Sequence, residues 1–595
     1  MALSKWRFAI TMAVLVILGS AERARALALN DDGTINLNMR AYVNVRVGTM
    51  AKQSTRPGDQ PPECAAQPNA TNCNFGGTFP YSGAGNVIQN RYFLEMKWNH
   101  DLMKWWGDVL PKSVTAFKYN LTYRGEYEGI YDFGPSAYSE NQESLQEIQQ
   151  ALRQGGYPVS GAQDLLTRQR NRLRNVASYR NRLFQAFVDW EQGPVFVRFG
   201  RQNLVWGETD VFRLLDNINP IDSSFGGFFI DLDERRVPLN MFRASYNIGS
   251  VGPVDEAFVE GYVAADNTVA GIPGAPTGSP WATPLGPPTG ATLTELDAPV
   301  VNGRNLRGGA RAVFNAVDTT FTLASYQTMF DVPAVRFEGA TPANNGYVQG
   351  VSAINAVQTY PLVWVNGASL TTAFPSLKSI LRAEVAYFKD EPLFVGPTET
   401  AVPGKGVTAQ YATAFLGPVV SGQLDTLSRQ DTFNMALGWD LNQLIRPINP
   451  NQTFFISTQF FYRHIFDYVS ASKDCINGTA SATTRCVAQS LPVPEPNNST
   501  RTIPIVQDTF LQTLAISTTY NVSAPFTNTN VQVSPGFNMF YDWQGMFLFQ
   551  PGVRFVRDPW RLILDYSAIN SGAYRYQIGL VRDRSNVRAQ LEYVL

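Results

Sequence analysis

Charged side chains crowd into one stretch of the sequence, and they are the first candidates for chemistry. Five arginines and seven carboxylates lie between residues 198 and 236. In a pore, rings of such side chains select the solute that passes. In a wide β-structure the same charges brace the wall as ion pairs, and both interpretations remain open. The candidates for a constriction are Arg198, Arg201, Glu208, Arg213, Asp216 and Asp222.

The same stretch offers a metal site as a further alternative. Asp216, Asn219 and Asp222 carry the oxygen atoms that Ca²⁺ prefers as ligands. Their spacing does not complete a calcium-binding loop, so we predict no metal.

Catalytic residues are scarce. The chain has two histidines, His100 and His464, and neither falls in a zinc, catalytic-triad or haem-attachment pattern. A hydrolase in which His464 acts as general base beside a Ser or Thr is an alternative, but a lone histidine in a strand is more often a wall residue. We therefore expect no enzyme and no cofactor.

The four cysteines form two pairs that are close in sequence, each within a stretch rich in turn-forming residues. Short disulfides that close loops in an oxidising compartment are the simplest interpretation. A shared zinc site lacks the usual ligand spacing and a nearby histidine. The predicted disulfides join Cys64 to Cys73 and Cys475 to Cys486.

The segments that must position these side chains alternate with period two, as half-buried β-strands do. Residues 35 to 47 place apolar side chains on one face and polar ones on the other. The same alternation recurs in residues 381–387 and 432–442, and the last segment suggests three closely spaced strands at 560–568, 574–580 and 587–595. We count about eighteen candidate strands.

Strand length separates a membrane barrel from a soluble β-sandwich or propeller. Many candidates span about ten residues, the length that a tilted strand needs to cross a bilayer. Aromatic residues also lie towards strand ends, as interfacial girdles do. The sequence therefore predicts an all-β fold, an antiparallel transmembrane β-barrel of about 16 to 18 strands. A soluble β-protein is the alternative.

Three other kinds of segment complete the predicted organisation. Residues 1–26 have the charged start, short apolar run and small-residue end of a cleaved signal peptide. Residues 27–595 form the barrel, with long loops at 50–86, 266–306, 331–375, 390–428 and 469–505. A helical insert at 136–182, rich in Gln, Arg, Leu and Glu, could plug the lumen or dock a partner.

Strand parity predicts which wall residues face the lumen, because apolar positions must face lipid. Together with the charged stretch these inward positions would form a polar wall. They are Arg40, Asn44, Arg46, Arg382, Glu384, Asp440, Arg561, Asp565, Arg575, Arg588 and Glu592.

One motif resembles a known family. Gly200-Arg201-Gln202 is followed by Trp206-Gly207-Glu208 and then by Asn217-Ile218-Asn219-Pro220-Ile221-Asp222. This resembles an uncharacterised family of large proteobacterial outer-membrane β-barrel proteins. The resemblance implies a location in the Gram-negative outer membrane and traffic of lipids or hydrophobic compounds, often beside transporters of the resistance-nodulation-division type.

Composition agrees with a membrane protein that does not bind nucleic acid. Charged residues are 16% and aromatic residues 12% of the chain, and the formal net charge is −1. After residue 30 no apolar run is long enough for a membrane helix. We expect a porin-like transport component in contact with outer-membrane lipid, with a transporter in the periplasm or inner membrane as its suggested partner. A plugged barrel that acts as a receptor or scaffold is the alternative.

Overall fold

The computed structural model describes most of the predicted barrel. The described residues are 27–49, 84–134, 171, 177–268, 281, 292–295, 306–330, 334–341, 353–397, 427–470, 487–494, 500–523, 530–571 and 584–595. The predicted signal peptide, the four cysteines, Arg575 and most of the predicted helical insert lie outside these residues.

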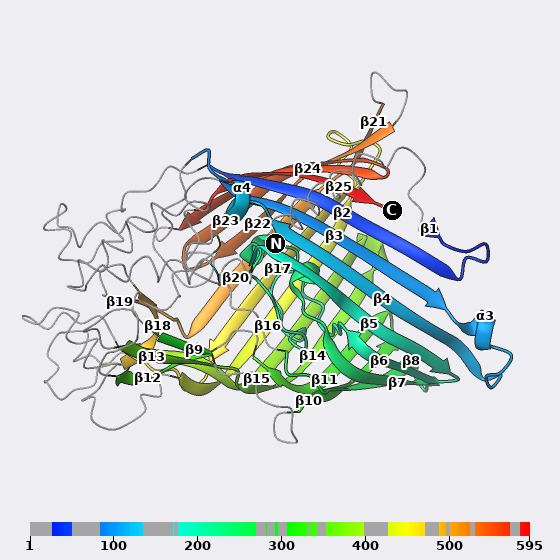
Figure 1. Ribbon diagram of the computed structural model, residues 1–595, viewed down its shortest axis with the longest axis horizontal. Coiled ribbons are helices and arrows are strands. Elements are labelled where there is room, and N and C mark those ends of the chain that lie inside the picture. The colour runs from blue at the N-terminus through cyan, green and yellow to red at the C-terminus, as the bar shows by residue number, and fades with distance from the viewer. Residues whose placement is uncertain are drawn as a thin grey trace, which may run out of the picture.

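Eighteen antiparallel strands form one closed barrel (Figure 1). Each strand pairs with the next in the wall, and the last strand pairs with the first to close the ring. In wall order they are β2 (Ile35–Gly48), β3 (Val87–Asp101), β4 (Val114–Glu128), β5 (Tyr179–Gln192), β6 (Val195–Gln202), β7 (Leu239–Val251), β8 (Val254–Ala264), β10 (Arg307–Ala316), β11 (Thr319–Met329), β14 (Leu362–Phe374), β15 (Ser379–Pro397), β16 (Leu427–Gln443), β17 (Phe454–Ile465), β20 (Asp508–Ser517), β22 (Asn530–Asp542), β23 (Met546–Arg557), β24 (Trp560–Ser571) and β25 (Asn586–Val594).

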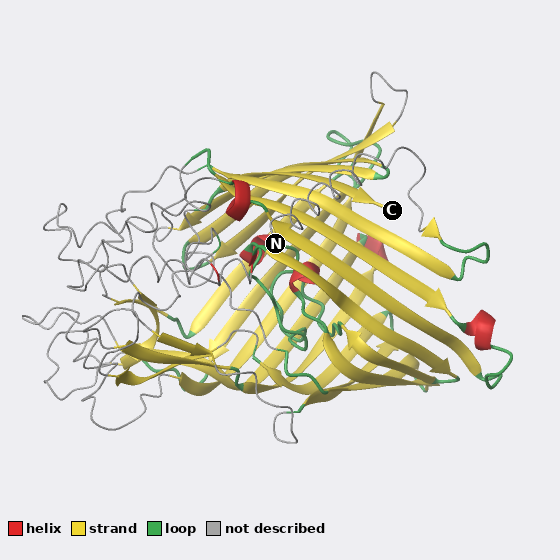
Figure 2. Cartoon of the chain, viewed as in Figure 1, coloured by secondary structure: helices red, strands yellow, loops and turns green. Residues whose placement is uncertain are grey.

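The remaining elements are short (Figure 2). None of the helices in the described part of the chain has the length and apolar character that crossing a bilayer requires. They are the strands β1 (Leu27–Ala28), β9 (Thr292–Glu295), β12 (Ala334–Thr341), β13 (Ala353–Thr359), β18 (Val487–Pro494), β19 (Thr500–Pro504) and β21 (Tyr520–Ser523), the helices α3 (Met103–Trp106), α4 (Ile130–Phe133) and α8 (Leu232–Arg235), and the 3-10 turns η3 (Gly227–Phe229) and η4 (Pro375–Leu377).

Alternation along each strand divides the side chains between the two faces of the wall. In β16, Met435, Leu437 and Trp439 are exposed on the outer face, while Ala436 is buried on the inner face. Period-two alternation requires this division, because successive side chains of a strand point to opposite faces. The predicted apolar outer face therefore covers the barrel, as lipid contact demands.

Most long connections leave one end of the barrel, and most short ones lie at the other. The turn between β5 and β6 holds residues 193–194 and the turn between β7 and β8 residues 252–253, and both lie at the same end. Both ends of the wall sequence, Ile35 and Val594, lie there as well. The long connections, such as residues 49–86 and 398–426, leave the other end.

Three sequence predictions need correction. Strand β14 lies within the predicted loop 331–375, because Asn366, Gly367 and Ser369 interrupt its apolar alternation. Strand β24 pairs directly with β25, so the wall has no place for a strand at 574–580 between them. Strand β5 begins at Tyr179, so the last four residues of the predicted insert 136–182 belong to this strand.

Candidate functional site

Residues 203–238, called the inward segment below, run through the interior of the barrel. They connect β6 to β7 and bond or stack with Tyr42 of β2, Glu260 of β8, Tyr326 of β11, Glu384 of β15 and Phe540 of β22. These strands are spread around the ring, so only a segment inside the ring reaches all of them. Figures 1 and 2 show the loops and short helices of this segment between the walls.

One asparagine of the motif ties the two ends of the inward segment together. The Asn219 side chain accepts a hydrogen bond from the Leu204 backbone N–H and donates to the carbonyl oxygens of Gln202 and Val237. Asn219 is fully buried. Without its side chain, the Leu204 N–H and the two carbonyl oxygens would be buried without these hydrogen bonds, which costs free energy. The amide therefore fixes where the chain leaves the wall and where it returns.

The first glycine of the motif lets the chain turn away from the wall. Gly200 has φ +127°, a conformation that L side chains rarely adopt, and a Cβ there would lie 2.3 Å from the Ala186 carbonyl oxygen. Only glycine therefore brings β6 this close to β5 just before the chain turns inward.

A wall carboxylate holds the middle of the segment. Glu384 accepts hydrogen bonds from the backbone N–H groups of Glu208 (2.5 Å) and Leu215 (2.6 Å). Two residues earlier in the same strand, Arg382 donates to the Glu208 carbonyl oxygen and pairs with Asp210. Strand β15 therefore binds residues 208–215 of the inward segment on one side of the lumen.

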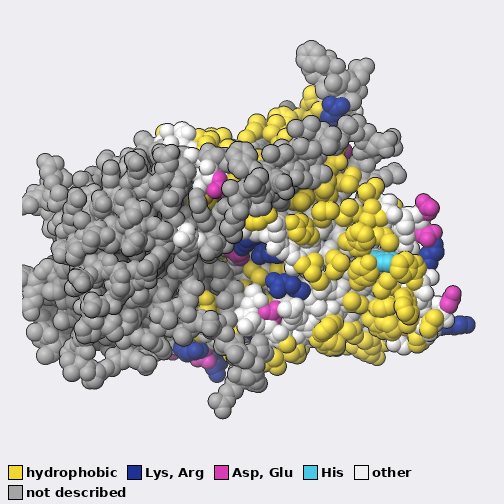
Figure 3. Space-filling view, viewed as in Figure 1, with side chains coloured by type: hydrophobic (Ala, Val, Ile, Leu, Met, Phe, Trp, Pro, Cys, Tyr) yellow, Lys and Arg dark blue, Asp and Glu magenta, His cyan; other side chains and the backbone are white. Residues whose placement is uncertain are grey.

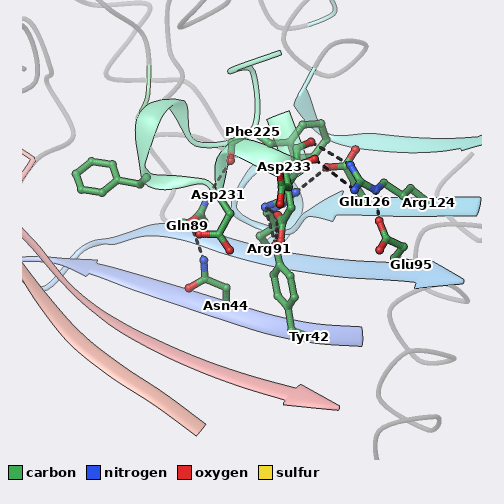
Figure 4. Close-up of polar contacts among 12 residues, drawn as sticks. Tyr42, Asn44, Gln89, Arg91, Glu95, Arg124, Glu126, Phe225, Asp231 and Asp233 are labelled. Carbon is green, nitrogen blue, oxygen red and sulfur yellow. Dashed lines mark hydrogen bonds and ion pairs between the residues drawn. The ribbon is translucent and has the colours of Figure 1, made fainter. Parts of the chain in front are cut away.

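An arginine-rich cluster on strands β2 to β5 binds the inward segment on the opposite side of the lumen (Figure 4). Glu234 of α8 pairs with Arg40 and Arg91 and accepts a hydrogen bond from the Tyr42 hydroxyl. Arg124 of β4 donates to the Glu234 carbonyl oxygen. Removing one partner from a buried ion pair costs about 3–5 kcal/mol because it leaves the other charge unpaired.

A second glutamate of this cluster binds several arginines. Glu126 of β4 pairs with three guanidinium groups, those of Arg91, Arg180 and Arg182. Arg180 also pairs with Asp222 of the inward segment. Phenylalanine rings cover the guanidinium groups, with Arg124 3.5 Å from the centroid of Phe184.

Two carboxylates of the inward segment have pKa values that move in opposite directions. Burial works to raise the pKa of Asp222, but the Arg180 guanidinium and hydrogen bonds from Ser224 hold it below its usual value. Burial raises the pKa of Asp216, and this effect exceeds the lowering by Arg213 and Arg236. Neither carboxylate is available to a calcium ion as the sequence alternative required, since both bind arginines.

Apolar side chains form a cluster on the side of the interior that faces β7 to β24, beside the ion pairs of Glu260 with Arg243 and Arg311. Trp206 is buried, donates its indole N–H to Glu260 and packs edge-on against Tyr262 and Tyr326. The cluster joins residues of the inward segment to inward residues of wall strands. Its members include Leu204, Leu214, Leu215, Ile218, Phe229, Met241, Val363, Val365, Phe388, Phe461, Leu511, Phe540, Leu548 and Ile569.

Most of the predicted lumen residues lie on the face that contacts the inward segment. Arg40, Arg46, Arg382 and Glu384 bond with it directly. The strand register or ion pairs place the others on that same inner face. They are Asn44, Arg198, Asp440, Arg561, Asp565, Arg588 and Glu592, while Glu208, Arg213, Asp216 and Asp222 belong to the segment itself.

Arg201 is the exception among the described predictions. The register pairs it with Asn240 and places it two residues from Phe199, which is exposed on the outer face. Arg201 therefore lies on the outer side of the wall, not in the lumen. Strand parity could have revealed this, because Arg201 has the same parity as Val197 and Phe199, whereas Arg198 has the opposite parity.

Sequence reasoning missed the wall partners of the segment. Arg91, Arg124, Glu126 and Glu260 are buried in ion pairs, yet none stood out in the sequence. The signal that could have found them is parity, since Arg91 and Glu95 share the inner face of β3 with Phe93. The aromatic residue between them obscured the polar face.

His464, the candidate base of the hydrolase alternative, contacts no hydroxyl nucleophile among the described residues. Its Nδ1 lies 2.8 Å from Asp508 and its ring packs against Phe466. His100 contacts the Tyr119 hydroxyl and Trp105. Across the described residues, no group of three or more His, Cys, Asp or Glu side chains is placed to hold a metal.

Comparisons with known proteins found solved structures of low overall similarity and one family. The solved structures that resemble the chain include OmpF of Salmonella typhi in complex with daunomycin (8% identity, 96% of this chain and 100% of that chain, TM-score 0.33). OccAB3 of Acinetobacter baumannii (6%, 94% and 98%, TM-score 0.37) and OprB of Pseudomonas putida (12%, 95% and 94%, TM-score 0.35) are others. No residue role is transferred from them. No curated protein matches the sequence, and one family model, described as a protein of unknown function, matches residues 7–595.

Proposed function

The chain belongs to the DUF1302 family of proteins of unknown function, and from that premise we propose that it is an outer-membrane channel. It passes hydrophobic or amphipathic small molecules through its lumen and catalyses no reaction. A barrel with an apolar outer face suits a lipid bilayer. A transporter in the periplasm or inner membrane remains the proposed partner.

The observation that carries the proposal is the division of the interior into two sectors. Inward from β2 to β5 the wall presents guanidinium groups, including Arg91, Arg124 and Arg180. Across the lumen the wall presents Tyr262, Phe461 and the other apolar residues named above, beside paired charges such as Arg311 with Glu260 and Arg382 with Asp440. A hydrophilic solute gains nothing from the apolar sector, whereas an amphipathic solute can contact both.

The inward segment makes these sectors meet. It contributes Trp206 and Phe212 to the apolar sector and Asp222 and Glu234 to the charged sector. In the proposed channel, the solute passes between an apolar side and a charged side. Such a passage selects by the shape and polarity of the solute, as pockets with a few placed polar groups do.

Ion current through single reconstituted barrels tests the proposal. We expect a small conductance that octanoate interrupts, because its chain and its carboxylate can contact the two sectors together. Propionate carries the same charge without the chain and should interrupt the current far less. Equal effects of the two anions would contradict an amphipathic passage.

A second function remains supported by one observation. Ion pairs and hydrogen bonds tie the inward segment to the wall on several sides. Such a segment could close the lumen, and the barrel would then act as a receptor or scaffold. Wild-type protein that inserts correctly and carries no current would favour this function over the channel.

A further inference from the structure

A cleft lies on the outer face of the wall, near the end that the long connections leave. The strand register places Gln327 of β11, Trp364 of β14 and Lys389 of β15 side by side. Val365 and Phe388, which follow and precede two of them, belong to the buried interior cluster, so this row faces outward. The cleft has a volume of about 350 Å³, within the range of small-molecule sites. Its lining includes Gln327, Leu362, Trp364, Asn366, Lys389 and Asp390.

A β-bulge in β15 gives the cleft its charged side chains. The register of β15 against β16 shifts between Phe388 and Glu391, and Asp390 within the bulge has φ +61°. Successive side chains of a regular strand point to opposite faces, but a bulge changes the direction of a side chain. Lys389 and Asp390 are accordingly both exposed, and both line the cleft. An ammonium and a carboxylate therefore lie together on the outer side of the wall.

Two cations at the cleft form no ion pair with any described carboxylate. One is Lys389, and the other is Arg429 of β16, whose guanidinium crosses β15 and donates to the Leu362 carbonyl oxygen at 3.4 Å. The nearby Asp431 carboxylate already accepts hydrogen bonds from the Tyr387 hydroxyl and the Asp390 backbone N–H. Both cations can therefore bind an anionic group of a ligand, and phosphate forms strong charge-assisted hydrogen bonds with such groups.

The uncharged side chains of the cleft suit a sugar. The Trp364 indole N–H donates to Ser325 Oγ at 3.1 Å and to Asn366 Oδ1 at 3.0 Å, which fixes the ring, and the side chain is 46% exposed. The Gln327 amide and the Asp390 carboxylate line the same cleft. An aromatic ring can pack against the C–H face of a sugar, while amide and carboxylate groups bond with its hydroxyl groups.

An apolar surface continues from the cleft towards the middle of the wall. Two rows nearer the short-turn end, the register aligns Leu323, Ala368, Val385 and Met435. Leu323 is 55% exposed and Met435 is 40% exposed on this outer face. Hydrophobic side chains also cover much of the flank that Figure 3 shows towards the short-turn end. A ligand with its polar head in the cleft can therefore lay apolar chains along the wall.

We propose that this cleft binds the phosphorylated sugar head group of an outer-leaflet glycolipid, with Lys389 and Arg429 on the phosphate and Trp364 against the sugar. Long connections mark the extracellular end of a membrane barrel, so the cleft meets the outer leaflet. A phospholipid head group would use the two cations but would leave the aromatic and amide groups without a sugar to bind. The inference rests on the proposed outer-membrane location and not on the passage of a solute.

The test is native mass spectrometry of the full-length protein in detergent, with bisphosphorylated lipid A, dephosphorylated lipid A or phosphatidylglycerol added in turn. The wild type should bind bisphosphorylated lipid A most tightly, because it alone carries both sugar and phosphate. Lys389→Gln should weaken this binding about tenfold, the effect of losing one charge-assisted hydrogen bond, and Lys389→Arg should keep most of it. Lys378→Gln, at an exposed lysine beside the short-turn end of β15, is the matched control and should match the wild type. Lys389→Gln should bind dephosphorylated lipid A as the wild type does.

A photo-crosslinking residue locates the bound lipid A. Placed at Leu323, below the cleft, it should capture far more lipid A than at Leu591, an exposed leucine of β25 on another side of the ring. Equal capture at both positions, equal affinity for phosphatidylglycerol and lipid A, or a Lys389→Gln variant with wild-type affinity for lipid A overturns the glycolipid site.

Single-channel recordings separate this site from the channel. Lys389→Gln should conduct as the wild type does, because Lys389 lies outside the lumen. Ion current without lipid A binding in the wild type overturns the glycolipid site and leaves the channel. Lipid A bound at the cleft of a barrel that carries no current supports the site and contradicts the channel. Heat-modifiable migration on gels verifies that each variant has folded.

Discussion

Replacing Glu384 by glutamine should release the inward segment from β15. The carboxylate accepts two hydrogen bonds, from Glu208 N at 2.5 Å and from Leu215 N at 2.6 Å. A glutamine keeps one acceptor oxygen and turns an NH₂ group towards the other N–H donor. One charge-assisted hydrogen bond is then lost, and one buried donor has no acceptor.

The size of the effect follows from those two bonds. A hydrogen bond to a charged group contributes about 1.5–3 kcal/mol, and an unsatisfied buried donor costs about 1–3 kcal/mol. A net loss of about 3 kcal/mol corresponds to a change of roughly 150-fold in the equilibrium between the docked and the released segment. Single-channel recordings should show this as more frequent visits to a level of higher conductance.

The same strand provides a matched control. Glu391 is also a buried glutamate of β15, but it bonds with Thr432 and Arg463 of the wall and not with the inward segment. Glu391→Gln should lower the stability of the barrel and leave the conductance levels unchanged. If both variants change the conductance alike, or if neither does, Glu384 does not hold the passage and the reasoning fails.

Three further predictions concern the wall and the segment. Leu564→Arg should destabilise the barrel in lipid by about 2–4 kcal/mol, because Leu564 is 38% exposed on the outer face; an unchanged urea midpoint would show that this face does not meet lipid. Trp206→Phe keeps an aromatic ring but leaves Glu260 without the indole donor, so the free energy of unfolding should fall by about 1–3 kcal/mol. Asp222 has a lowered pKa beside Arg180, so it stabilises the fold above about pH 4 and this contribution is lost as the pH falls below that value. Asp222→Asn should therefore be less stable at pH 7 and should lose less stability than the wild type between about pH 4 and pH 2, which urea titrations at each pH would check.

The barrel could be predicted from the sequence because lipid imposes a simple pattern on each strand. Only one residue in two must be apolar, and strands such as β16 and β25 obey this rule closely. Strand β14 shows where the rule weakens. Its sequence holds Asn366, Gly367 and Ser369, which resemble a loop when no partner strand is known.

The inward course of the charged segment could also be predicted, because charge is excluded from lipid. Its partners could not. The contact between Asn219 and the two ends of the segment depends on residues 15 to 18 positions away, and the contact between Glu384 and Leu215 spans 169 positions. Such pairs follow from the closure of the ring, which no local pattern encodes.

The disulfides remain a prediction, since Cys64, Cys73, Cys475 and Cys486 lie outside the described residues. Mass spectrometry of peptides from the unreduced protein would identify the pairs. Cys64 joined to Cys475, or four free thiols, would contradict the predicted pairing of neighbours.

The central claim is that the inward segment narrows the lumen into a passage. Its most direct test is the single-channel conductance of a variant in which a short Gly-Ser linker replaces residues 207–237, measured beside the wild type in the same bilayer. The claim predicts that the shortened variant folds into a barrel whose conductance is several-fold higher and no longer distinguishes octanoate from propionate. A folded variant with the conductance and anion response of the wild type would contradict it.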